Sequence, residues 1–366
     1  MRLVPNGFVR RALQDLASEQ VLAGYFAKAA EKSGYARTLV SALYPIGESF
    51  FGTENRYKLI DREGDLLCVT EDAVTGLLNA CEDGLNRLYT HTEVYRYRGE
   101  DRNVRQCAAL LAGVAGPEAE AEVILLGLEV LRSLGVNGKV KISSTYVLQG
   151  LAEVYFGYRP DAETVIAWIN AKPRTDAESA MFTVIDAVKR MCGGAEVIKD
   201  ATELLTNRVS GVGLKNVLDL YDVLCGLGKQ DQVEIDLSVM GRPYDCGSVF
   251  EIVDEENNVL LRGGRHDFLR GAETIRATSI VMVPAEVMTY YRVKETTKAS
   301  VVLGVETGII ALSAAYKLKE DLIEAGVPSV SMLYGVGAED TARYAEAFGI
   351  ESAVFVDGEG KASAVK

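Results

Sequence analysis

The chain of 366 residues is 48% hydrophobic and 25% charged, an ordinary globular composition that suffices for two or three domains of about 100–200 residues each. Its net charge of −13 and a pI near 4.9 repel a phosphate backbone, so nucleic acid is not expected as a partner. Six cysteines without CxxC spacing, only two histidines and no long apolar run predict no metal cluster, no disulfide framework and no membrane span, as in a soluble cytoplasmic protein.

The first 80 residues combine helical and strand patterns. Apolar residues at helical spacing predict a helix over Phe8–Ala30 that stops at Ser33-Gly34, and Tyr35–Leu43 predicts a strand. The stretch Tyr57–Glu71 has the pattern strand, turn, strand, and an apolar helix follows. Glu71 lies at the start of that helix, where a carboxylate favours the helix dipole whether or not a ligand is present.

The middle of the chain continues with one more helix and strand and then becomes mostly helical. Pro117–Leu134 predicts an amphipathic helix with an acidic first turn, and Lys139–Ser143 predicts a strand. Leu148–Gly228 has a helical pattern interrupted at glycines and prolines, and we interpret it as a packing module. Its apolar residues expected in the core are Val165, Trp168, Ile169 and Phe182.

The stretch Val233–Leu269 predicts an approach strand over Glu234–Val239 and then a hairpin. Gly247–Val253 alternates small, apolar and charged groups, a turn follows at Asp254–Asn258, and the apolar run then resumes. A glycine pair leads directly into Arg265, His266 and Asp267. Because glycine lets backbone approach a ligand closely, these side chains either converge on a ligand or belong to a surface hairpin with a charged turn.

The end of the chain predicts a small α/β domain after a linker at Thr296–Lys298. The turn GVETG after its first strand has a weak likeness to a phosphate-binding loop. The expected order is strand Ser300–Val305, helix Gly308–Ala325, strand Val330–Leu333, helix Ala338–Phe348 and strand Ser352–Val356.

The hairpin region resembles a known family. MGRPYDCGSVFE, the hairpin and GGRHDFL resemble the block RGLDYYTGTVFE, hairpin, GGRYDGL of histidyl-tRNA synthetases and their paralogues. The resemblance implies an α+β fold of the class II aminoacyl-tRNA synthetase type, with an antiparallel sheet core over residues 1–295, a helical insertion at 148–228 and an anticodon-binding-like α/β domain at 299–366. The residues that keep the pattern are Gly241, Tyr244, Gly247, Val249, Phe250, Glu251, Gly263, Gly264, Arg265 and Asp267.

The same resemblance implies a ligand site. Glu71 takes the place of a carboxylate that receives the amino group of a bound amino acid. Arg96 and Gln106 lie in a stretch from Leu88 to Val114 that resembles the second class II motif, whose arginine holds the adenylate phosphate; as a generic alternative, Arg96 and Arg98 simply alternate outward on an edge strand. The implied binding residues, for histidine or a related amino acid, are Glu71, Arg96, Gln106, Tyr244, Asp245, Arg265 and His266.

The positions that face the imidazole in the family are altered in this chain. Two tyrosines are replaced by Asp245 and His266, and a glutamate is replaced by Leu110. Asp245 could accept an imidazole N–H, which keeps a histidine pocket possible. The alternatives are a different small amino acid, no ligand at all, or a structural pair between His266 and a neighbouring carboxylate.

Two of the three cations that a ligase of this family uses are missing. Met240 stands where an arginine opens the block, and Ile280–Met288, in the place of the third class II motif, contains no arginine. Each group that stabilises the developing charge contributes a factor of about 10²–10³ in rate. Arg242 lies two residues after Met240 and would point the same way in a strand, so it could compensate in part.

With these cations missing, the chain resembles the family's non-synthetase branch, the regulatory subunits of ATP phosphoribosyltransferase. The resemblance then implies no catalytic residues and no cofactor. It also implies a short-form catalytic subunit as partner in the first step of histidine biosynthesis, feedback sensing of histidine, and a homodimer within a hetero-oligomer. An active amino-acid-activating ligase of altered specificity and a scaffold for protein contact alone remain the alternatives.

Overall fold

The computed structural model of the chain describes residue 8 and residues 13–46, 56–97, 101–158, 160, 162–170, 175–242, 245–270, 273–291 and 300–366. The chain divides into two compact units, Met1–Val293 and Lys294–Lys366. The hydrophobic clusters of the described residues each belong to a single unit, so each unit builds its core from its own side chains. The expected linker Thr296–Lys298 lies outside the described residues.

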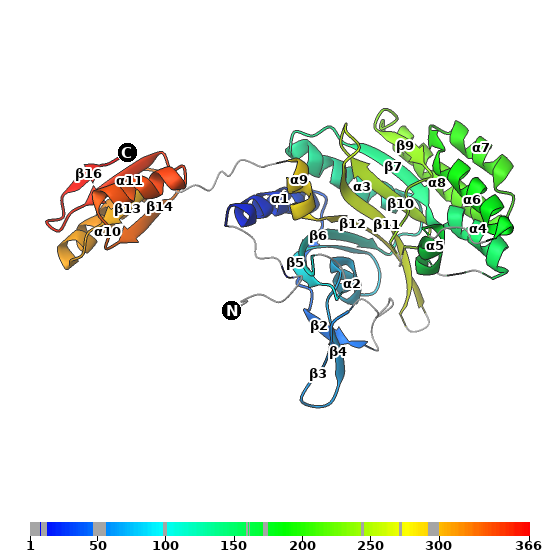
Figure 1. Ribbon diagram of the computed structural model, residues 1–366, viewed down its shortest axis with the longest axis horizontal. Coiled ribbons are helices and arrows are strands. Elements are labelled where there is room, and N and C mark those ends of the chain that lie inside the picture. The colour runs from blue at the N-terminus through cyan, green and yellow to red at the C-terminus, as the bar shows by residue number, and fades with distance from the viewer. Residues whose placement is uncertain are drawn as a thin grey trace. The chain divides into compact units, whose positions relative to one another are not determined.

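A mixed sheet of nine described strands forms the centre of the larger unit (Figure 1). Its middle strands pair antiparallel, whereas two short strands pair parallel with their neighbours. This sheet confirms the expected antiparallel core of the class II type. In spatial order the strands are β1 (Ala36–Arg37), β5 (Asn86–Tyr95), β6 (Asn103–Ala112), β12 (Glu273–Met282), β11 (Val259–Arg270), β10 (Ser248–Val253), β7 (Lys139–Ser144), β9 (Val233–Asp236) and β8 (Cys192–Gly193).

The hairpin expected from the sequence is formed by β10 and β11, with Val249 opposite Gly264 and Phe250 opposite Gly263. A Cβ atom on Gly263 would lie 2.1 Å from Cζ of Phe250 and 2.4 Å from the backbone oxygen of Ser279. Only glycine fits at this position, because the Phe250 ring lies directly against the neighbouring strand. Gly263 is therefore required for packing within the sheet.

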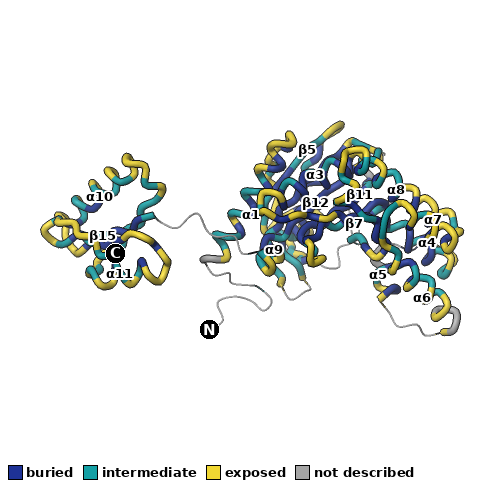
Figure 2. Tube along the Cα trace, turned by 90° about the horizontal axis from the view of Figure 1, so that it is seen from above, coloured by how far each residue is buried: buried dark blue, intermediate teal, exposed yellow. Residues whose placement is uncertain are grey.

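Helices cover both faces of the central sheet. α1 (Leu13–Lys32), α3 (Glu118–Ser133) and α9 (Pro284–Tyr290) pack on one face, where Phe26, Ile124 and Phe250 belong to a single large core. α2 (Ala73–Asn79) packs against β5 and β6 on the other face and forms a second core with them. Figure 2 shows α3, β12 and β11 as largely buried elements.

The helical module expected from the sequence is present beside the sheet, next to β7 and β9 (Figure 1). Trp168 is buried there and stacks on Tyr155, with ring centroids 5.0 Å apart. None of the described helices is both long and apolar enough to cross a bilayer. The module consists of α4 (Thr145–Phe156), α5 (Ala162–Ile169), α6 (Asp176–Lys189), α7 (Glu196–Leu204) and α8 (Arg208–Gly226).

Two strands differ from the sequence-based expectation. The single strand expected over Tyr35–Leu43 is divided into β1 and β2 (Leu43–Pro45), and β2 joins a separate small sheet with β4 (Leu66–Val69) and β3 (Lys58–Ile60). The chain leaves the large sheet so that Val40 can pack on α2, where a Cβ on Gly76 would lie 2.7 Å from Cβ of Val40. The approach strand β9 ends early, at Asp236, in a turn.

The smaller unit is an α/β sandwich whose sheet order is β14-β13-β15-β16. The first three strands are parallel and β16 pairs antiparallel with β15, a strand that the sequence did not predict. Val302 packs with Ala345 of α11, and Val305 packs with Ala311 of α10, so the two helices cover opposite faces. The elements are β13 (Val301–Val305), α10 (Ile309–Glu324), β14 (Val330–Tyr334), α11 (Ala338–Ala347), β15 (Ser352–Val356) and β16 (Ala362–Ala364).

Candidate functional site

The expected ligand residues come from β6, β11 and the connections around α2 and β10. Gln106 contacts the N-terminus of α2, and His266 lies opposite Ala277 in the β11–β12 register, on the sheet face that α2 covers. Arg265 precedes His266 in the same strand, so its side chain projects to the opposite face. Tyr244 lies outside the described residues.

Glu71 uses both carboxylate oxygens on neighbouring side chains. Its Oε1 lies 2.5 Å from Nη2 of Arg56, whose side chain is almost fully buried, and its Oε2 accepts a 2.6 Å hydrogen bond from the hydroxyl of Tyr44. Burial raises the pKa of Glu71, opposed by the Tyr44 hydrogen bond and the charge of Arg56. Asp72, and not Glu71, caps α2, because its carboxylate accepts from the backbone N–H of Val74.

Gln106 is also engaged within the protein. Its side chain is buried in β6, and Oε1 accepts a 2.8 Å hydrogen bond from the backbone N–H of Ala73. Gln106 and Asp72 together satisfy the first amides of α2, which would otherwise attract an anion.

His266 is completely buried and forms the centre of a polar network. Its Nδ1 lies 2.9 Å from Oδ1 of Asp245, and its Nε2 lies 2.6 Å from the hydroxyl of Ser279. Arg242 lies against the same group, with Nη2 3.1 Å from the Ser279 hydroxyl and 3.4 Å from Nε2 of His266. The structure thus contains the His–carboxylate pair that was one of the alternatives read from the sequence.

The charges within this network follow from its burial. Burial and the nearby charge of Arg242 lower the pKa of His266, while Asp245 opposes that shift. Although burial disfavours its charge, Asp245 has a lowered pKa because of Arg242 and the hydrogen bond to His266. A neutral imidazole beside an ionised carboxylate carries its proton on Nδ1 and accepts at Nε2.

Arg265 binds the start of α3 on the other face of β11. Its guanidinium forms a bidentate ion pair with Glu120, with Nε to Oε1 at 2.7 Å and Nη2 to Oε2 at 2.5 Å. It also donates to the backbone oxygens of Val114 and Gly116 at 3.2 and 2.9 Å. Four hydrogen bonds therefore fix this side chain in a structural position.

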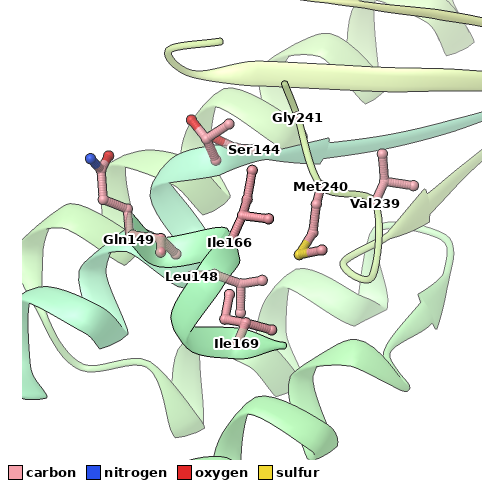
Figure 3. Close-up of a pocket in the computed structure, with 10 residues that line it drawn as sticks. Ser144, Leu148, Gln149, Ile166, Ile169, Val239, Met240 and Gly241 are labelled. Carbon is pink, nitrogen blue, oxygen red and sulfur yellow. The ribbon is translucent and has the colours of Figure 1, made fainter. Parts of the chain in front are cut away.

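The side chains of Met240 and Arg242 point to different places. Residues 237–242 are not a strand, so the alternation that would align these two side chains does not apply. Met240 enters an apolar pocket, in which Figure 3 shows it beside Leu148, Ile166 and Ile169. Arg242 instead points to the network around His266.

The other two positions at which a ligase of this family carries an arginine are Arg96, which keeps the arginine, and the third motif, which does not. Arg96 follows β5, is half-buried, and has no hydrogen bond or ion pair from its side chain to a described residue. In the place of the third motif, β12 is followed by α9, whose Val287 is fully buried in the large core. An aliphatic side chain there offers no cation to a nucleotide.

One cluster among the described residues has the composition of a metal site. Ligand atoms of Cys192, Glu234 and Asp236 lie within 4.8 Å of one another. The Nζ atom of Lys141 lies 3.0 Å from Asp236 and 3.8 Å from Glu234, and Lys139 also pairs with Glu234. These ammonium groups already compensate the carboxylates.

Most partners of the expected residues could not be predicted from the sequence. Arg56, Tyr44, Glu120 and Ser279 had no role in the prediction, although each contacts an expected ligand residue. An acidic first turn marked the helix that contains Glu120, but nothing local paired it with a residue 145 positions away. Among the partners, Arg242 and Asp245 had been recognised as candidates.

An antiparallel sheet covered by helices on both faces, with the hairpin block at its centre, defines a class II synthetase-like protein. A family model described as histidyl-tRNA synthetase matches residues 14–278, and the chain belongs to that family. Solved structures share this fold. One is an ATP phosphoribosyltransferase regulatory subunit/histidyl-tRNA synthetase from Bacillus halodurans C, with a TM-score of 0.72, 19% identity and coverage of 97% of this chain and 98% of that one. Another is histidyl-tRNA synthetase from Nostoc sp. PCC 7120, with a TM-score of 0.73, 17% identity and coverage of 99% of this chain and 96% of that one.

Two sequence relatives carry the name of the regulatory subunit. A protein named ATP phosphoribosyltransferase regulatory subunit from Halothermothrix orenii is 28% identical over 244 residues, which cover 61% of this chain and 58% of that protein. A protein of the same name from Syntrophotalea carbinolica is 29% identical over 204 residues, 52% of this chain and 46% of that protein. The chain thus spans about half the length of these relatives.

Proposed function

We propose that this chain is a regulatory, non-catalytic subunit that works with a short-form ATP phosphoribosyltransferase in the first step of histidine biosynthesis. The observation that carries the proposal is that the expected ligand residues around the sheet face covered by α2 are already bound to other residues of the chain. The carboxylate of Glu71, the amide oxygen of Gln106, and the polar groups of Asp245 and His266 all bind partners within the protein. These contacts stabilise the fold, and they leave few polar groups on this face of the sheet free to act on a substrate.

The apolar surroundings of two former cation positions support the same proposal. Met240 occupies an apolar pocket and Val287 belongs to the core, so neither position can stabilise the charge of a nucleotide. The names of the sequence relatives agree with a regulatory role. We further propose a cytoplasmic location, a homodimer within a hetero-oligomer, and histidine or a related amino acid as feedback ligand.

Ligand roles for Glu71, Arg96, Gln106, Tyr244, Asp245, Arg265 and His266 stay a prediction. An amino acid could bind there only by exchanging the internal contacts of several of these residues. The smaller unit, proposed as the counterpart of an anticodon-binding domain, carries ten acidic and five basic residues between 300 and 366. That charge disfavours RNA and suits a protein contact.

Reconstitution tests the proposed function. The purified chain is mixed with a short-form catalytic subunit, and complex formation is followed by size-exclusion chromatography while phosphoribosyl transfer is assayed. We expect a stable complex, activity that depends on this chain, and inhibition by histidine only in the complex. Absence of a complex would refute the proposal, and amino-acid-dependent pyrophosphate exchange by the chain alone would establish the ligase in its place.

A further inference from the structure

A polar cleft lies on the opposite face of β11 from His266. Its volume is about 360 Å³, and it is lined by the start of α3, by α4 and α8, and by β10, β11 and β12. This volume falls within the range of small-molecule sites, about 300–1,000 Å³. The charged groups of the lining belong to Glu120, Asp219, Arg265, Asp267 and Arg276, of which Asp219 pairs with Lys215 of the same helix; Asn216 and Ser248 add an amide and a hydroxyl group.

The floor of the cleft is rigid and electrically balanced. The side chain of Arg265 is 10% exposed and that of Glu120 is 2% exposed, and the two form the bidentate pair described above. Cys246 also lines the cleft, and burial raises the pKa of its thiol to about 11, so it is neutral at physiological pH. The charges left to meet a ligand are therefore those of the rim.

The rim presents a carboxylate and a guanidinium side by side. Asp267 of β11 lies directly opposite Arg276 of β12, and the two form an ion pair. Oδ1 of Asp267 is buried and accepts no hydrogen bond from a described residue, although it lies 3.9 Å from Nη1 of Arg265. The side chains of Asn216 and Ser248, from α8 and β10, likewise have no hydrogen bond to the described part of the chain, so three elements offer unused hydrogen-bonding capacity to one space.

We propose that this cleft binds an α-amino acid as a zwitterion, with the ammonium group at Asp267 and Asn216 and the carboxylate at Arg276. The two charges of an α-amino acid are separated by a single carbon atom, which matches the adjacent charges of opposite sign on the rim. The ligand binds by exchanging the contact between Arg276 and Asp267, whereas Asn216 and Ser248 have no internal hydrogen bond to a described residue to give up. Carboxylates and guanidinium groups form strong charge-assisted hydrogen bonds with such ligands, and here the side chain of Asp267 is 17% exposed and that of Arg276 is 51% exposed. The proposal deepens the regulatory function proposed above, on which it rests, and places the effector away from the sheet face around His266.

Calorimetry on the full chain, with no partner present, tests the site against each of the twenty amino acids. We expect at least one to bind, and its analogues lacking either the ammonium or the carboxylate group to bind more weakly. Arg276→Gln and Asn216→Leu should each weaken binding by at least about tenfold, as expected for loss of a charge-assisted or buried hydrogen bond. Arg132→Gln is the matched control, because Arg132 is an exposed arginine paired with Glu129 at the other end of α3.

The possible results separate this site from the proposed function. No binding by any amino acid, or binding that Arg276→Gln and Asn216→Leu leave unchanged, would overturn the site. Binding that is lost in Glu71→Gln but kept in Arg276→Gln would place the ligand on the sheet face, which also overturns it. If an amino acid binds in the cleft but no complex forms with a catalytic subunit, the site stands and the proposed function fails. Circular dichroism confirms that each variant is folded.

Discussion

The buried pair of Arg265 and Glu120 allows a quantitative test of how the larger unit is held together. In Glu120→Met, the guanidinium of Arg265 stays buried and keeps the backbone oxygens of Val114 and Gly116, while the carboxylate of Asp267 lies 3.9 Å away and compensates its charge only in part. Breaking a buried ion pair by removing one partner costs about 3–5 kcal/mol, since the remaining charge loses its main compensating partner. We expect this loss in the free energy of unfolding, and a similar loss for Arg265→Met.

Urea denaturation monitored by tryptophan fluorescence measures the free energy of unfolding of the larger unit. The chain has a single tryptophan, Trp168, which is buried in the core of the larger unit. The double variant Glu120→Met/Arg265→Met leaves no unpaired charge, so it should lose at least about 2 kcal/mol less than the sum of the two single variants. Single losses below about 1 kcal/mol that simply add would refute the reasoning.

Three further predictions concern the sheet and its faces. Gly263→Ala places a Cβ against Phe250 and should destabilise the larger unit by at least about 2 kcal/mol in urea denaturation, whereas Gly24→Ala, in an open position of α1, should be neutral or stabilising. Because burial lowers the pKa of His266, its contribution to the free energy of unfolding is present above the unfolded pKa of about 6.5 and declines as pH falls below that value. His266→Asn should therefore reduce the slope of stability against pH in this range by up to about 1.4 kcal/mol per pH unit. An unchanged slope would contradict this prediction. Met240→Arg should lower the melting temperature and yield no amino-acid-dependent pyrophosphate exchange, since the new charge enters an apolar pocket; exchange activity in this variant would contradict the placement of Met240.

The regular elements could be predicted from sequence wherever one pattern extended over a whole element. The hairpin of β10 and β11, helix α3 and the helical module follow from alternation, glycine position and helical spacing. The strand over Tyr35–Leu43 was wrong because Val40 packs on α2, a tertiary contact that interrupts a locally favourable strand. β8 has only two residues and provides no periodic pattern.

The site could be predicted as a set of residues, but of its internal pairs only that of Asp245 with His266 was foreseen, as one of several alternatives. Resemblance identified Glu71 and Arg265, whereas the geometry adds that Arg56 and Glu120 bind them. The identity of such partners depends on which elements meet in space, and residues 145 positions apart carry no local signal of that meeting. The direction of Met240 likewise depended on the end of β9, which sequence alternation overestimated.

The mutual pairing on the sheet face has a consequence for how this protein could change over generations. Freeing Glu71 for a substrate would remove its ion pair with the buried guanidinium of Arg56, and freeing Asp245 would remove its contact with the imidazole of His266. Each single step toward a ligand-reading surface thus passes through a less stable protein, and only paired changes avoid it. A substitution elsewhere on the fold carries no such cost, which favours the appearance of new recognition away from this face.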